Sequence, residues 1–184
     1  IRIINLFFII FFLISAKAYS LIEIDITRGN LDPLPIAVSP LFQDDNSKSN
    51  SINELKIENV GSEISLVVEN NLKISGLFNP LSKEAFLQKP DIAHLKPRFE
   101  DWALIKAQAL ITGKVTIEDK KLKVEFRLWD ILAGREMMAL AFTTVPSNWR
   151  RVGHIISDKV YERLTGEKGY FDTRIIYVSE EGPK

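Results

Sequence analysis

Few side chains in this sequence are of a type that could carry out chemistry. His94 and His154 are the only histidines, and there is no cysteine. His94 lies in a proline-bounded loop with Asp91 before it and Arg98 after it. The Asp91, His94 and Arg98 loop is therefore the one candidate for a small ligand-binding or enzymatic site. That function requires the loop to lie over a concave pocket with convergent polar groups.

The second histidine fits a structural role better than a catalytic one. His154 falls inside a predicted helix, with Arg150 and Asp158 one turn away on either side. A helical histidine with such neighbours is usually a satisfied boundary residue. Neither histidine belongs to an H-E-x-x-H pattern, and the glycines form no phosphate-binding loop. We therefore expect no enzyme activity, no cofactor and no metal.

One aromatic residue is not explained by its local pattern. Trp129 falls on the polar side of its predicted strand. It is either covered by another element or part of a contact surface. We expect that it is covered.

The beginning of the chain has the three parts of a secretory signal peptide. Arg2 precedes a nine-residue apolar run over 6–14, and Ala16 and Ala18 supply the small residues before a cleavage point at Tyr19. As a helix the run spans about 14 Å, which is short of a hydrocarbon core of about 30 Å. The sequence therefore predicts export with residues 1–18 removed, rather than an uncleaved anchor.

Composition narrows the class of protein further. Lys and Arg together number 24, as do Asp and Glu, and residues 1–18 contain two basic residues and no acid. The remainder is slightly acidic, which disfavours nucleic acid or an anionic membrane surface as a partner. The absence of cysteine excludes disulfides and lipid attachment at a cysteine, so the core must hold the fold.

The elements that would position these residues follow from hydrophobic periodicity. Apolar residues alternate along three successive runs at 109–117, 122–129 and 138–142, which predicts an antiparallel meander. Apolar residues at helical spacing predict amphipathic helices over 53–75 and 147–164, the second with an N-cap at Ser147. The remaining expected elements are strands over 21–27, 35–41 and 171–179, an extended segment over 77–81, one helical turn over 82–87, a loop over 88–97 and a short helix over 98–106.

This order favours an α/β fold of the α+β type. We expect a mixed, largely antiparallel sheet of about five strands with two main amphipathic helices packed on it. The part after residue 18 is about one domain in length.

Several segments resemble the N-terminal domain of the TolB family. Residues 149–154 (WRRVGH) and 157–166 (SDKVYERLTG) resemble its second helix. Residues 169–178 (GYFDTRIIYV) are similar to that family's link into its β-propeller. Further similar segments occur in the same order at 22–29, 35–38 and 75–81.

The resemblance implies a non-catalytic periplasmic component of the Tol–Pal system, which serves outer-membrane integrity and envelope constriction at cell division. It implies an inner-membrane partner, TolA, contacted by the segment just after the signal peptide. In this sequence that segment consists of Tyr19, Ser20, Leu21, Ile22, Glu23, Ile24 and Asp25. A short strand with alternating apolar residues can pair with a sheet edge on a partner, although it can equally pair inside its own sheet.

The resemblance also divides the chain. Residues 1–18 are the expected signal peptide, 19–168 the TolB-like α/β domain, and 169–184 a linker or first strand towards a propeller that the sequence does not contain. The propeller is the part of the family that binds the lipoprotein Pal, so Pal is an expected partner only where the propeller is present. No small-molecule substrate and no nucleic acid are expected.

Overall fold

The computed structural model describes residues 22, 24, 32–43, 57, 59–118 and 120–173. The expected signal peptide (1–18), five residues of the expected contact segment (Tyr19, Ser20, Leu21, Glu23 and Asp25) and residues 174–184 lie outside this part of the chain.

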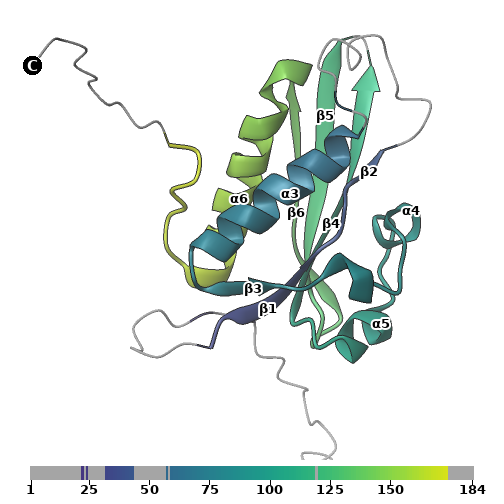
Figure 1. The fold of residues 1–184 in the computed structure, drawn as a ribbon, viewed down its shortest axis with the longest axis vertical. Helices are drawn as coiled ribbons and strands as arrows, with labels where there is room; N and C mark the ends of the chain where they lie inside the picture. The colour runs from purple at the N-terminus through teal and green to yellow at the C-terminus, as the bar shows by residue number, and fades with distance from the viewer. Residues whose placement is uncertain are drawn as a thin grey trace, which may run out of the picture.

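The described sheet has six strands, and an early strand occupies its interior. β1 (Leu34–Val38) lies between β3 (Phe78–Pro80) and β4 (Ala109–Glu118) and is parallel to both (Figure 1). β2 (Phe42–Gln43) pairs in parallel with the later half of β4. The parallel pairings are short, three or two residues each.

The long strands form the predicted meander. β5 (Lys121–Asp130) is antiparallel to β4 over its whole length, and β6 (Arg135–Thr144) is antiparallel to β5. A register shift between Leu128 and Trp129 interrupts the second pairing. The sheet is therefore mixed, and its longest pairings are antiparallel.

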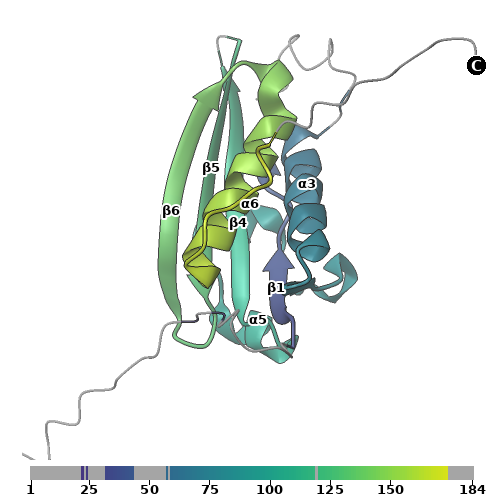
Figure 2. The same cartoon turned by 90° about the vertical axis from the view of Figure 1, so that its left-hand side faces the viewer.

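Two helices cover one face of this sheet. α3 (Val60–Ile74) and α6 (Trp149–Thr165) lie side by side over the strands, as the side view in Figure 2 shows. Their apolar stripes meet one face of the strands in the main core, because side chains alternate between the two faces of a strand. The largest fully buried members are Ile36, Ile64, Leu72, Ile111, Leu122, Phe126, Leu128, Ile156 and Leu164.

The first main helix begins later than its apolar pattern predicts. Its N-cap is Asn59, whose side chain accepts a hydrogen bond from the Ser62 amide at 2.8 Å. Ile57 belongs to no helix, so the expected start at residue 53 was wrong. The cap sets the start of the helix at Val60, although apolar residues at helical spacing continue upstream of it. At the other end Gly76 has φ 75°, as expected for a residue that stops a helix.

The last helix also differs at its start. A 3-10 turn, η3 (Pro146–Asn148), comes first, and the N-cap is Asn148 rather than Ser147. Gly166 has φ 74° and ends the helix, as predicted.

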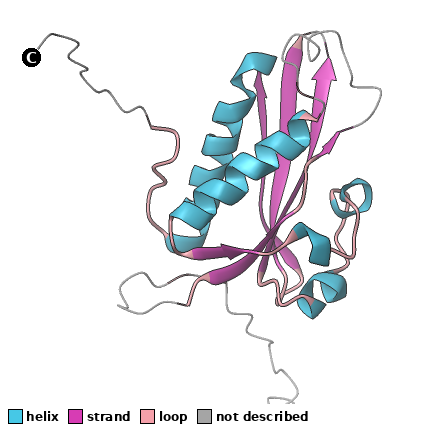
Figure 3. Cartoon of the chain, viewed as in Figure 1, coloured by secondary structure: helices cyan, strands magenta, loops and turns pink. Residues whose placement is uncertain are grey.

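The opposite face of the sheet is covered at one end by short elements (Figure 3). These are η2 (Lys83–Ala85), α4 (Pro90–Ala93) and α5 (Phe99–Leu104). The expectation of a plain loop over 88–97 was wrong, because Pro90 begins a four-residue helix at its first position, where a proline is tolerated. A second buried cluster lies under these elements and contains Ala37, Ala93, Trp102, Ala107, Leu110, Trp129 and Ile131.

The cluster confirms that Trp129 is covered. Its ring packs edge-on against Phe99, with centroids 5.9 Å apart, and it is 7% exposed. The α+β fold class is thus confirmed, with six strands rather than about five. Among the described helices, none has the length and apolar character needed to cross a bilayer.

Candidate functional site

The expected contact segment is described at two positions, and both pack on the domain itself. Ile24 is 9% exposed and belongs to the main core, and Ile22 is half-buried against that core. The Ile24 amide donates to the Leu164 carbonyl at 2.7 Å. The last four carbonyls of a helix have no partner within it, so Ile24 satisfies one such group at the end of α6.

At Ile24 the backbone contact differs from the expected pairing inside the sheet. The Ile24 amide bonds to the end of a helix rather than to a strand of the sheet. An alternating apolar pattern therefore does not require pairing with a strand. It requires only that the apolar side chains are buried, and the Ile24 side chain is buried in the main core.

The alternative site at Asp91, His94 and Arg98 is not assembled. His94 stacks on Phe42, with ring centroids 4.6 Å apart, and its Nδ1 lies 3.0 Å from the Pro90 carbonyl oxygen. The Arg98 guanidinium pairs with Asp101, its Nε donating to Asp101 Oδ2 at 2.8 Å. Asp91 and His94 line two different depressions, and Arg98 lines neither of them.

The larger of these depressions lies on the outer face of β4, β5 and β6. It has a volume of about 620 Å³ and is widely open. Two of its charged side chains have partners: Arg127 pairs with Glu136 at 3.4 Å, and Glu125 pairs with Lys123 at 3.0 Å. Asp91 and Arg98 are not part of its lining, so the depression does not bring the three residues of the alternative site together.

His154 has the structural role that its position suggested, but with a different partner. Its Nδ1 lies 2.9 Å from Asn71 Nδ2, and the same amide group donates to Ser157 Oγ at 2.9 Å. These contacts join α3 to α6 beside Gly153, where the two helices pack closely. Within the described residues no group of three His, Asp or Glu side chains is placed to hold a metal ion.

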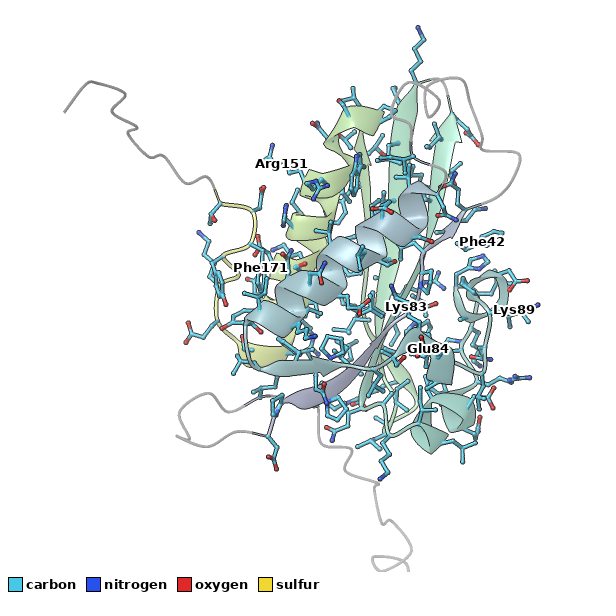
Figure 4. All side chains as sticks on the ribbon, viewed as in Figure 1. Phe42, Lys83, Glu84, Lys89, Arg151 and Phe171 are labelled. Atoms are coloured by element: carbon cyan, nitrogen blue, oxygen red, sulfur yellow. The ribbon has the colours of Figure 1, made fainter. Side chains whose placement is uncertain are left out.

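A set of contacts that the sequence did not predict lies on the flank of α6. Asp158, which the sequence suggested as a neighbour for His154, instead accepts hydrogen bonds from the backbone of the segment that follows the helix. Arg151 binds Asp172 of the same segment. In Figure 4 Arg151 and Phe171 lie on this flank, on the opposite side of the molecule from Phe42 and Lys89. The signal that could have shown this was the glycine at 169, whose backbone approaches α6 closely.

Comparison with known proteins shows that the chain belongs to one family, the TolB family. The model of the TolB amino-terminal domain matches residues 22–137. The chain is 78% identical over 177 residues to the Tol-Pal system protein TolB of Pelagibacter ubique (strain HTCC1062). This match covers 96% of the chain and 40% of that relative, so the chain spans less than half of the relative's length.

One solved structure supports the fold. The crystal structure of TolB from Acinetobacter baumannii matches with a TM-score of 0.60 and 22% identity, over 77% of this chain and 30% of that one. A PelC dodecamer from Paraburkholderia phytofirmans matches with a TM-score of 0.41 and 14% identity, over 73% of this chain and 88% of that one.

Proposed function

Because the chain belongs to the TolB family through its amino-terminal domain, we propose that it is a protein-interaction component of the Tol–Pal cell-envelope system. It acts in the periplasm without catalysis, after cleavage of residues 1–18, and serves outer-membrane integrity and constriction at division. The observation that carries the proposal is the 78% identity to a Tol-Pal system protein over nearly the whole chain.

The proposed contact is the segment Tyr19 to Asp25, and the proposed partner is a TolA-like inner-membrane protein. The segment is short and alternates, so in extended form it can add a strand to a sheet edge on that partner. Its own domain holds it by the Ile24 amide and by two isoleucine side chains. Binding in that mode therefore requires the segment to leave the end of α6, which adds a free-energy cost to the association.

The site geometry supports a binding role over an enzymatic one. The three side chains of the alternative site do not line a common depression, and each of His94 and Arg98 has a local partner. A Pal-like lipoprotein is a further partner only of a protein that carries the propeller.

Titration calorimetry with the C-terminal domain of a TolA protein tests the proposed contact. We expect binding by residues 19–184 and loss of binding on deletion of 19–25. Lys121→Glu, an exposed change on the β5 end of the sheet, is the control and should leave binding unchanged. If the deletion binds as well as the parent chain, the proposed segment is wrong.

A further inference from the structure

The chain reverses direction directly after α6 and returns along the same helix. Gly166 adopts a left-handed conformation with φ 74°, which ends the helix and turns the backbone. The following residues, coloured yellow in Figure 2, run back across α6. Their contacts move from Asp158 in the middle of the helix to Arg151 in its first turn. The segment therefore contacts two residues of α6 that lie about 10 Å apart along the helix at 1.5 Å per residue.

The closest approach of the segment is at Gly169. A Cβ atom at this position would lie 2.4 Å from the Asp158 Cα and 2.5 Å from its Oδ1. Both distances are far shorter than a van der Waals contact. The backbone of the segment thus lies directly on the helix, and only glycine fits there without a shift of the chain.

Asp158 binds the backbone of the segment with both carboxylate oxygens. Oδ1 accepts from the Phe171 amide at 2.7 Å, and Oδ2 accepts from the Asp172 amide at 3.1 Å. Hydrogen bonds to an ionised acceptor are stronger than neutral ones. Two successive amides held by one side chain fix the direction of the backbone at that point, and not only its position.

Two further contacts hold the same segment. Arg151 donates from Nε and from the terminal guanidinium nitrogen to the Asp172 carboxylate, at 3.1 to 3.2 Å. This pair is exposed, so by itself it contributes little. Tyr161 packs edge-on against Tyr170 and Phe171, with ring centroids 5.5 and 5.8 Å apart. Tyr161 also contacts Phe78 of β3, so the aromatic rings connect the segment to the main core.

We propose that these contacts, the exit clasp formed by Arg151, Asp158 and Tyr161 with residues 169–173, fix the direction in which the polypeptide leaves this domain. A tether that only joined two domains would need no specific contacts with α6. The family model that matches this chain is of an amino-terminal domain, and the match covers 40% of the Pelagibacter relative, so in such a protein a further part follows this domain. The exit clasp gives that continuation a fixed orientation relative to the sheet and helices of this domain. This inference does not depend on the TolA contact proposed above.

The first experiment tests whether the clasp forms in solution. Amide hydrogen exchange of the chain should show Phe171 and Asp172 protected. Asp158→Asn keeps the shape of the side chain but leaves one accepting oxygen, so exchange of these two amides should accelerate by about tenfold. Lys159 is next to Asp158 in the sequence, but its side chain pairs with Glu162. Lys159→Ala should therefore leave the exchange rates of the Phe171 and Asp172 amides unchanged. Unprotected amides in the parent chain would overturn the proposal.

The second experiment tests whether the clasp sets an orientation. In a full-length protein carrying this domain, spin labels are placed at position 121 and at a position in the part that follows residue 184. This chain contains no cysteine, so a label at position 121 has no competitor within it. Asp158→Asn and Gly169→Ala should each broaden the distance distribution while Lys159→Ala leaves it narrow. Circular dichroism checks that both variants remain folded. A distribution that stays narrow when the amides are deprotected contradicts the proposed role.

Discussion

The indole Nε1 of Trp129 donates a hydrogen bond to Thr112 Oγ1 at 2.8 Å, across neighbouring strands on the outer face of the sheet. Both residues are buried, Thr112 being 1% exposed. The bond satisfies the one polar atom of a large aromatic side chain that α5 covers.

Replacing Thr112 by valine should therefore destabilise the domain although the volume is nearly conserved. The buried indole N–H loses its acceptor, at a cost of about 1–3 kcal/mol. Urea unfolding should show the loss, and Thr116→Val, at a half-exposed position further along the same face of β4, should change stability by less than about 0.5 kcal/mol. Equal effects of the two substitutions would mean that the bond contributes nothing specific.

The close packing of α3 and α6 predicts a second effect. A Cβ at Gly153 would lie 2.8 Å from Val67 Cγ1 and 2.9 Å from its Cβ. Gly153→Ala should therefore destabilise the domain by about 1–3 kcal/mol, because the helices must separate. Val67→Ala makes room for the added methyl group. In a double-mutant cycle measured by thermal unfolding, the two changes together should cost less than the sum of the single changes.

Asn59 gives a test of the helix cap. Asn59→Ala removes the acceptor of the Ser62 amide and should lower the free energy of unfolding by about 0.5–2 kcal/mol. Asn59→Asp retains the acceptor and places a negative charge at the positive end of the α3 dipole, so it should be neutral or stabilising at neutral pH. A destabilising effect of aspartate equal to that of alanine would show that the cap bond is not the cause.

Tyr161 predicts a dependence on alkaline pH. Burial raises the pKa of its phenol above the ordinary value, and Tyr170 and Glu167 add to this rise. The neutral phenol is then favoured in the folded state, so the unfolded chain ionises first and stability falls as the pH rises through the raised pKa. Tyr161→Phe should reduce the loss of stability between about pH 8 and pH 11. Urea midpoints at the two pH values measure this. Tyr170→Phe removes only a secondary contribution to the raised pKa, so it should reduce the loss of stability by less than Tyr161→Phe does.

The long periodic elements were predictable from the sequence, because their burial follows a simple spacing. Leu122, Val124, Phe126 and Leu128 alternate in the sequence and face the core in β5. The stripe of α6 from Val152 to Leu164 is likewise buried at helical spacing. In both cases a single face of the element packs on a single core, so the local apolar pattern is enough to predict which side chains are buried.

The parts that were not predictable depend on partners distant in sequence. The start of α3 at Val60 depends on the Asn59 cap, whereas apolar residues continue upstream at helical spacing. Asp158 binds the backbone of a segment that folds back along α6 from beyond its end. The spacing of residues 154 and 158 is the same with or without that segment, so the spacing alone could not identify the partner of Asp158. The alternating apolar pattern of the proposed contact segment is visible in the sequence. The hydrogen bond from Ile24 to Leu164 was not predictable from it, because the two residues are 140 positions apart.

The position of β1 between β3 and β4 has a consequence for the order of assembly. β1 is made early, yet its two neighbours are Phe78–Pro80 and Ala109–Glu118. The β4–β5–β6 meander needs only neighbouring hairpins, so it can form as soon as those residues are available, whereas β1 must close loops of tens of residues. We therefore infer that the meander is the nucleus on which the earlier strand is later inserted. A growing chain that has not yet reached residue 111 holds β1 with one edge still unpaired, because only β3 is present, and this is the stage at which that edge most needs to be kept from pairing with other chains.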